Sequence, residues 1–324
     1  MFFSPVGCLN NIAIEYALME DFSTFAEQFD VYRLSSTREV VTTSSTKKME
    51  NARLFGGLQY NAKMEDVDLA NREAGLLSDA PLMASRAPVD SLMLRGGAGY
   101  LAYTLKEVDD IEEQLKGNMK DVKVFSGIHG TEEAFKNLSG KQTDILHVAT
   151  HGFFWSEEQA NRMGNLAFLT AANENASSEE DKALSRSGLL FAGANATLTH
   201  KQVPDNMEDG ILTARELSQM DLRGTNLVVL SACQTALGTI TGDGVFGLQR
   251  GFKKAGAKTM VMSLWKVDDQ ATQILMTAFY RHLAEGQSPR SAFLAAQQHL
   301  RHIENGRFID PIYWAAFILL DALE

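Results

Sequence analysis

The sequence predicts an α/β protein of three layers, α/β/α, built around a mainly parallel central sheet. Strand-like and helix-like patterns alternate from residue 104 onward, as in folds whose parallel strands are joined by crossover helices. Two continuous apolar runs, NLVVLS and KTMVMSL, are typical of strands buried on both faces of such a sheet. Two long amphipathic helices follow them, one with apolar residues from Ala271 to Phe279 and one with apolar residues from Ala292 to Ile303.

The chain divides into three expected parts. Residues 1–72 form a strand-rich N-terminal part, in which VYRL and ARLFGGL are strand-like. Residues 73–100 contain two prolines and a Gly-Gly-Ala triplet, so we expect a connecting loop or arm there. Residues 101–324 form the core that is expected to carry the function.

Within the core, the local patterns give the elements in order. A helix with the apolar stripe Val108, Ile111 and Leu115 precedes the strand VKVF, and the helix TEEAFKNL has Thr131 as its expected cap. DILHVAT, NLAFLTA and GLLFAG are strand-like, and TARELSQM is a helix with the capping box Thr213 and Glu216. GVFGLQRGFKKAGA is expected as a helix with a glycine stop, YWAAFILL as a late strand, and residues 174–187 as a polar loop.

Composition excludes several classes of protein. With 324 residues, 45% hydrophobic and 22% charged, the chain can bury a substantial core, and its net charge of −11 argues against nucleic acid as a partner. The two cysteines, Cys8 and Cys233, cannot form a disulfide framework, which indicates a reducing, cytoplasmic compartment. The first residues lack the basic region of a signal peptide, and no apolar run is long enough for a membrane span.

Polar residues with catalytic potential follow two of the predicted strands. His151 and Gly152 come after DILHVAT, and Cys233 comes after NLVVLSA. Parallel sheets place chemistry at the carboxyl ends of their strands, so His151 would lie close to Cys233 if the two strands are neighbours. A histidine can take the proton of a thiol, whose free pKa of about 8.5 otherwise keeps it protonated. The alternatives are a buried, inert cysteine and, for Gly152, a simple strand-ending turn.

Two other motifs point to different chemistry and are weaker. His147 and His151 form H-x-x-x-H, which would suggest zinc on a helix, but this segment is strand-like, so we expect no metal and a structural His147. Gly242, Gly244 and Gly247 match G-x-G-x-x-G, with Asp268 about twenty residues on. A nucleotide-binding fingerprint follows its strand directly, and here ten residues intervene, so we expect no cofactor.

Several long stretches resemble the CHAT domain, a family of caspase-like cysteine peptidases related to separases. They are DILHVATHG, DGILTARELSQMDLRGTNLVVLSACQTALG, GVFGLQRGFKKAGAKTMVMSLWKVDDQAT and DPIYWAAFILL, and the likeness extends to the opening FFSPVGCLNNIAIEYAL. The resemblance implies a caspase-like fold, His151 as general base and Cys233 as nucleophile, with Gly152 and Cys233 forming the oxyanion hole. CHAT domains are often joined to tetratricopeptide repeats, which implies either that the chain is a fragment or that a separate regulatory protein is its partner.

The resemblance also bears on the substrate. SLWKVDDQAT follows the strand after the one that precedes Cys233, so Asp268 and Asp269 would lie beside the nucleophile; alternatively they cap the following helix. The stretch resembles the separase segment whose aspartate receives an arginine, and Asp269 is the closer match. We therefore expect cleavage of a protein or peptide substrate after arginine, with lysine weaker and aspartate excluded.

The polar loop of residues 174–187 also contains candidate positions for self-cleavage. Caspase-like enzymes often cut themselves in a connecting loop, so self-cleavage is expected after Arg186 or Lys182 in the polar loop. The alternative function is a catalytically quiet CHAT module that binds or scaffolds a partner protein, and a nucleotide-binding domain is the more remote possibility.

Overall fold

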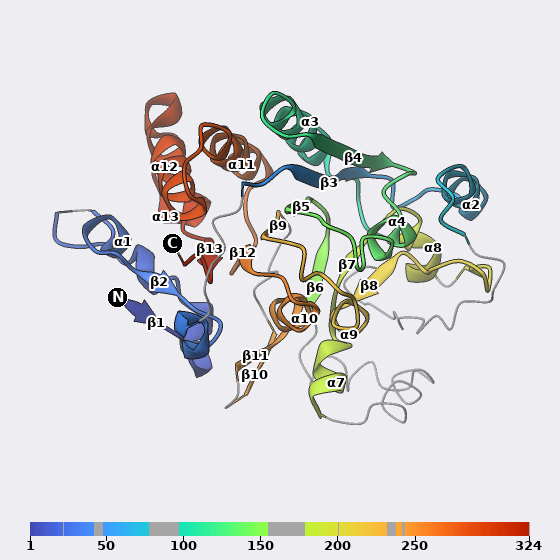
Figure 1. The fold of residues 1–324 in the computed structure, drawn as a ribbon, viewed down its shortest axis with the longest axis horizontal. Helices are drawn as coiled ribbons and strands as arrows, with labels where there is room; N and C mark the ends of the chain where they lie inside the picture. Colours follow the sequence, from blue (N-terminus) through green and yellow to red (C-terminus); the bar gives the residue numbers. More distant parts are fainter. Residues whose placement is uncertain are drawn as a thin grey trace.

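An eight-stranded, mainly parallel sheet forms the centre of the structure (Figure 1). The structure, a computed structural model, describes residues 1–21, 23–41, 48–77, 97–154, 179–199, 201–231, 238–241 and 244–323. The strands in spatial order are β1 (Phe2–Phe3), β2 (Tyr32–Arg33), β13 (Phe317–Leu320), β12 (Thr259–Ser263), β9 (Leu227–Leu230), β5 (Ile145–Val148), β3 (Asn51–Leu58) and β4 (Asp121–Gly127). Neighbours pair in parallel except β12 with β13, so β1, β2 and β13 run opposite to the other five strands.

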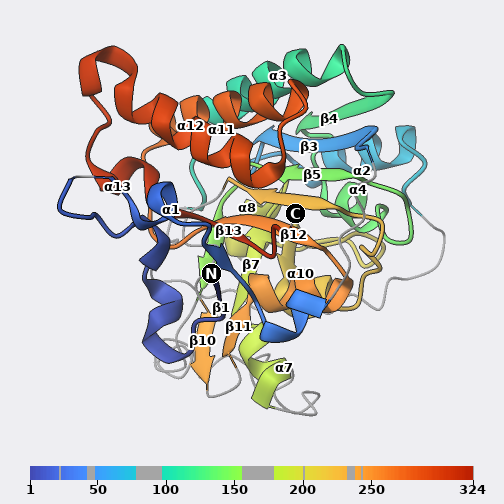
Figure 2. The same cartoon turned by 60° about the vertical axis from the view of Figure 1, so that its left-hand side comes forward.

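Helices cover both faces of this sheet and complete three layers. One face carries the long helices α3 (Ala102–Lys116), α11 (Asp269–Ala284) and α12 (Pro289–His302), which lie together above the sheet in Figure 2. The other face carries α4 (Glu132–Lys136), α8 (Ala194–Leu198), α9 (Ala214–Leu217) and α10 (Leu248–Ala255). Each face has its own buried apolar cluster, so the predicted three-layer α/β/α fold with a mainly parallel sheet is confirmed.

The remaining elements lie around this core. A three-stranded antiparallel sheet consists of β6 (Gly152–Phe154), β7 (Ser187–Leu190) and β8 (Ile211–Thr213), and a hairpin consists of β10 (Gly238–Thr241) and β11 (Gly244–Gly247). The other helices are η1 (Gly7–Asn11), η2 (Ile14–Tyr16), α1 (Phe25–Gln28), η3 (Thr37–Val41), α2 (Met64–Glu73), α7 (Glu179–Leu184), η4 (Ile303–Gly306) and α13 (Pro311–Trp314).

Local sequence explains where several of these helices begin and end. Thr131 accepts a hydrogen bond from the Ala134 N–H at 3.1 Å, which caps α4 as predicted. Thr213 and Glu216 form the predicted capping box of α9. After α10 the backbone turns at Gly256 with φ of +98°, a conformation that glycine adopts without the steric penalty of a side chain.

Three expected elements differ from the structure. GVFG was expected to open a helix but forms β11, because it pairs with β10 from Gly238↔Gly247 to Thr241↔Gly244. The segment expected as a polar loop contains α7 over Glu179–Leu184 and enters β7 at Ser187, while residues 174–178 lie outside the described ranges. YWAAFILL begins in α13 and becomes β13 only at Phe317; the stretch NLAFLTA lies outside the described residues.

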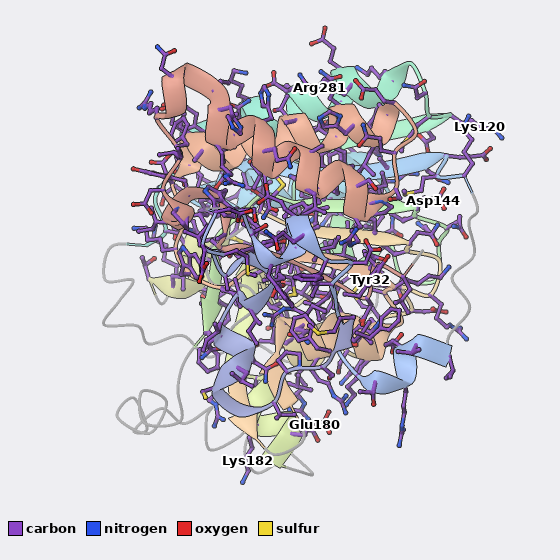
Figure 3. The ribbon with its side chains drawn as sticks, turned by 90° about the vertical axis from the view of Figure 1, so that its left-hand side faces the viewer. Tyr32, Lys120, Asp144, Glu180, Lys182 and Arg281 are labelled. Carbon is purple, nitrogen blue, oxygen red and sulfur yellow. The ribbon has the colours of Figure 1, made fainter. Side chains whose placement is uncertain are left out.

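A buried carboxylate fixes the amino ends of three central strands. Asp144, labelled in Figure 3, is fully buried just before β5. Its Oδ2 accepts hydrogen bonds from the backbone N–H groups of Glu50 and Asn51 at 2.8 and 3.2 Å, and its Oδ1 accepts one from Asn226 Nδ2 at 2.8 Å. Because these partners precede or begin β3 and β9, Asp144 sets the register of β3, β5 and β9 from one end.

The two ends of the described chain meet at one edge of the sheet. β2 pairs with β13 at Arg33 and Leu320, and the Asp321 carboxylate accepts hydrogen bonds from the Ser35 N–H and hydroxyl at 2.8 and 2.6 Å. Residues 1–35 therefore take their place in the sheet only beside residues 317–321. Among the described residues no helix is both long enough and apolar enough to cross a membrane.

Candidate active site

The strands that precede His151 and Cys233 are direct neighbours in the sheet. β5 and β9 pair in parallel, and Val148 lies opposite Leu230. In the sequence, His151 is three residues beyond Val148, and Cys233 is three residues beyond Leu230. Cys233 itself lies in residues 232–237, outside the described part of the chain, whose last residue here is Ser231.

A backbone carbonyl orients the His151 ring. His151 Nε2 lies 2.7 Å from the carbonyl oxygen of Gly99. Because a carbonyl oxygen can only accept, Nε2 must carry the proton and donate it. The other ring nitrogen, Nδ1, therefore keeps its lone pair in the neutral imidazole, and this lone pair is what a general base requires.

The Gly99 carbonyl is itself held in place by a buried asparagine. Asn195, on α8, accepts a hydrogen bond from the Ala98 N–H at 2.6 Å and donates one to the Ala98 carbonyl at 2.9 Å. This pair of bonds fixes the backbone next to Gly99 in the way that a strand neighbour would. The segment that ends the expected arm of residues 73–100 thus becomes part of the site.

The Tyr60 ring packs against His151, and the Tyr60 hydroxyl is held by Thr150. The Tyr60 ring centroid lies 5.0 Å from that of His151. The Thr150 hydroxyl donates to the Leu190 carbonyl at 2.5 Å, so it must accept from the Tyr60 hydroxyl 2.8 Å away. Burial raises the pKa of Tyr60 to about 12, and the phenol therefore stays protonated and able to donate at neutral pH.

The N–H of Gly152 points away from the neighbouring strand β7. Leu190 N–H donates to the His151 carbonyl at 3.0 Å, and Gly152 lies opposite Leu189. In an antiparallel ladder bonded and non-bonded pairs alternate, so Gly152 occupies a non-bonded position. Its N–H is thus directed away from β7.

A cavity of about 310 Å³ lies beside His151, between the first turns of α3 and α11. Asp269, the first residue of α11, lines this cavity and is exposed, whereas Asp268 serves as the N-cap and accepts a hydrogen bond from the Ala271 N–H at 2.9 Å. The two aspartates thus have different roles in the structure: Asp268 caps the helix, and Asp269 lines the cavity. The Asp269 side chain is exposed and lies at the rim of the cavity.

A larger cavity, of about 840 Å³, opens at the opposite edge of the sheet. It is lined by residues at the amino ends of strands, among them Ile145, Leu227 and Thr259. Parallel α/β sheets carry their chemistry at the carboxyl ends of their strands. His151 lines the smaller cavity and does not line the larger one, so we assign the candidate site to the smaller cavity.

The two expected self-cleavage positions lie on and after α7. Lys182 is half-buried on α7, which forms the lower end of the molecule in Figure 3. Arg186 is 9% exposed and the next residue, Ser187, is 1% exposed at the start of β7. Cleavage after Arg186 would therefore require this segment to open first, and self-cleavage at either residue stays a prediction.

His147 is buried, and both of its ring nitrogens contact other side chains. Its Nδ1 lies 3.1 Å from the Tyr280 hydroxyl, and its Nε2 lies 3.0 Å from Glu107 Oε1. Burial, and then the charge of Glu107, raise the pKa of Tyr280 well above its ordinary value, so Tyr280 remains a neutral donor to the histidine.

One acidic cluster has the spacing of metal ligands but is occupied by a lysine. Glu132, Glu208 and Glu216 bring carboxylate oxygens within 4.8 Å of one another. Lys136 Nζ lies 2.7, 2.8 and 3.1 Å from them, respectively. The ammonium group takes the central place that a cation would need, so the cluster is a buried ion-pair network.

Sequence reasoning did not find Gly99, Asn195, Tyr60 or Thr150. Gly99 and Asn195 lie 52 and 44 positions from His151 along the chain, and neither belongs to a motif. Thr150 directly precedes His151, and a hydroxyl next to a candidate base was the only local signal available.

A mainly parallel sheet that brings an oriented histidine and the strand before a cysteine to one edge is the arrangement of a peptidase-like α/β domain. The chain belongs to the CHAT domain family, whose model matches residues 1–322.

Curated relatives share part of this domain. Tetratricopeptide repeat protein 28 of Mus musculus is 36% identical over 111 residues, which are 34% of this chain and 4% of that protein. Its Homo sapiens counterpart is 32% identical over 114 residues, 35% of this chain and 4% of that protein. The chain therefore matches only a small part of the length of these relatives.

Among solved structures, the Arg-specific cysteine proteinase gingipain R aligns with 90% of this chain and 53% of its own, at 6% identity and a TM-score of 0.44.

Proposed function

We propose that the chain is a cysteine endopeptidase that cleaves protein substrates after a basic residue, preferably arginine, with His151 and Cys233 as its catalytic dyad. The observation that carries the proposal is the pairing of β5 with β9, together with the Gly99 carbonyl that leaves His151 Nδ1 as the basic nitrogen. Membership of the CHAT family supports the proposed peptidase function.

The proposed reaction proceeds in two steps. His151 Nδ1 takes the thiol proton, and the Cys233 sulfur attacks the scissile carbonyl carbon, while the N–H groups of Gly152 and Cys233 hold the oxyanion. The C–N bond breaks as His151 returns the proton to the leaving amine, which leaves a thioester. Water then attacks the thioester, gives its proton to His151, and releases the carboxylic acid and the thiol.

A peptide-based electrophile directed at thiols tests the proposal. The wild-type chain should be labelled at Cys233 and should cleave members of a peptide library, and Cys233→Ala should do neither. Because Cys8 is an exposed free thiol, Cys8→Ser is the matched control and should keep both labelling and cleavage. If Cys233→Ala cleaves the library as fast as the wild type, the proposed mechanism is wrong.

A second candidate function is a catalytically quiet module that binds or scaffolds a partner protein. The similarity to tetratricopeptide repeat protein 28 favours it, since that name denotes a repeat protein. The same labelling experiment separates the two functions, because a quiet module would leave Cys233 no more reactive than Cys8.

Asp269 is expected to contribute to the arginine preference from the rim of the cavity. An ion pair that stays exposed to water contributes up to about 1 kcal/mol, so Asp269→Asn should lower kcat/KM for arginine peptides about fivefold relative to neutral ones. Lysine peptides should be weaker substrates because ammonium cannot make the paired hydrogen bonds of guanidinium, and aspartate peptides should be refused.

The matched control for this prediction is Asp268→Asn. It removes a charge of the same sign one residue away, and the amide oxygen still caps α11. Kinetics on peptides that differ only in Arg, Lys or Asp before the scissile bond provide the measurement. Equal losses in the two variants would contradict a specific role for Asp269.

A further inference from the structure

The cavity beside His151 contains buried polar atoms that lack hydrogen-bond partners in the described part of the chain. Ser231 is 6% exposed and Thr272 is 5% exposed, and neither hydroxyl has a hydrogen-bond partner among the described residues. Both residues line the cavity, as does Glu107 on α3, which is 1% exposed. Buried polar groups in folded proteins are almost always paired, so three such side chains around one space call for an explanation.

Glu107 has spare capacity to bind a ligand. Its Oε1 lies 3.0 Å from His147 Nε2, in a contact without hydrogen-bond alignment, and this is its one ion pair among the described residues. A carboxylate offers about four lone-pair positions, and no described residue donates a hydrogen bond to Glu107 Oε1, so acceptor positions remain open there.

The unpaired groups form a set that suits a guanidinium. A carboxylate and two hydroxyl oxygens offer a negative charge and several acceptors, while guanidinium has five N–H donors in one plane and no acceptor. The cavity volume of about 310 Å³ is at the lower end of the range for small-ligand sites, about 300–1,000 Å³. A neutral or anionic side chain would bring no positive charge to the buried Glu107 carboxylate.

We propose that Glu107, with the hydroxyls of Thr272 and Ser231, forms the inner wall of the pocket for the arginine that precedes the scissile bond. The inference rests on the proposed peptidase function and adds the residues that select the substrate. Ser231 is two residues before Cys233, which places this wall beside the segment of the nucleophile.

Burial decides which carboxylate selects the substrate. Asp269 is exposed at the rim, where the exposed Lys266 also lines the cavity and opposes an incoming cation. Glu107 is buried, and a desolvated charge pair discriminates far more strongly than a pair that stays in water. Glu107 is therefore the main specificity residue, and Asp269 assists at the entrance.

Binding measured without chemistry tests the proposal. The probe is a fluorescent peptide with arginine before the scissile bond, and its counterpart has citrulline, which keeps the shape and loses the charge. The protein is the full chain with Cys233→Ala. Arginine should bind at least about tenfold more tightly than citrulline, and Glu107→Gln should bring this ratio close to one. Thr272→Val and Ser231→Ala should each weaken arginine binding several-fold.

Tyr280→Phe is the matched control, because it removes the other hydrogen bond of His147 and leaves Glu107 in the cavity. It should keep the arginine-to-citrulline ratio. An unchanged ratio in Glu107→Gln would overturn the proposal. If that variant does not fold, full arginine affinity in both Thr272→Val and Ser231→Ala would overturn it.

The outcome is separable from that of the proposed function. If the wild-type chain hydrolyses no peptide and the binding ratio still depends on Glu107, the pocket stands and the peptidase assignment fails. If the wild type cleaves after arginine and Glu107→Gln keeps the ratio, the peptidase assignment stands and the pocket fails.

Discussion

Peptide hydrolysis by the His151→Ala chain is expected to fall at least about a thousandfold below that of the wild type, with the fold intact. A base and a nucleophile that act as one unit lose most of the rate when either is removed, and the double variant with Cys233→Ala should be little worse than either single one. The measurement is kcat/KM on one arginine peptide, with circular dichroism as the check of folding.

His302→Ala is the control for this experiment. His302 lies on α12, away from the cavity, with its Nδ1 2.7 Å from the Gln298 carbonyl. It should keep full activity. A His151→Ala chain that hydrolyses within tenfold of the wild-type rate would remove His151 from the mechanism.

The Lys136→Met chain is expected to be less stable than the wild type by about 3–5 kcal/mol at neutral pH. Lys136 is the cation that contacts the carboxyl groups of Glu132, Glu208 and Glu216, and its removal leaves these groups together in a buried place without a positive charge. Burial alone would lower the pKa of Lys136, but the three neighbouring glutamates raise it above its usual range. The lysine is therefore charged throughout the pH range of the measurement. Urea unfolding gives the measurement.

The loss should depend on pH in a defined direction. Burial raises the pKa of Glu132 well above its ordinary value of 4.5, and Lys136 opposes this rise. The folded state then holds the Glu132 proton to higher pH than the unfolded chain, so the contribution of this group to stability is full below about pH 4.5 and declines as the pH rises through the folded-state pKa. Without Lys136 that pKa is higher still, and the decline is larger.

The deficit of Lys136→Met should therefore be small at about pH 5 and large at about pH 8. Lys141→Met is the control, because Lys141 is exposed and its Nζ contacts Asn137 Oδ1 at 2.8 Å. It should unfold at the wild-type urea concentration. Equal stability of Lys136→Met and wild type at about pH 8 would contradict the ion-pair network.

The sheet and the location of the site could be predicted because their signals are local. Runs such as NLVVLS lie in strands that are buried on both sides, and both cores confirm this burial. His151 and Cys233 were found because each directly follows such a run. A residue that directly follows an apolar run can be placed at a strand end from the sequence, even when the sequence does not reveal which strands are neighbours.

The supporting parts of the site depend on contacts that no local pattern encodes. GVFG has the apolar spacing of a helix start, and only its pairing with Gly238–Thr241 makes it a strand. Glu107 adjoins the apolar stripe of α3 and would be assigned to its solvent face, yet α11 and β5 cover it. Asn195 acts on the backbone of Ala98 across 97 positions, a distance at which sequence gives no register.

The sheet edge formed by β1, β2 and β13 can be completed only after most of the described chain has been synthesised. The Ser35 N–H donates its hydrogen bond to the carboxylate of Asp321, which is 286 residues later in the sequence. A ribosome that adds roughly 5–20 residues per second needs roughly 15–60 s to cover that distance. Throughout this time β1 can pair with β2, but β2 lacks its other neighbour, β13. The β1–β2 pair therefore cannot dock onto the sheet through β13 before residues 317–321 have been made.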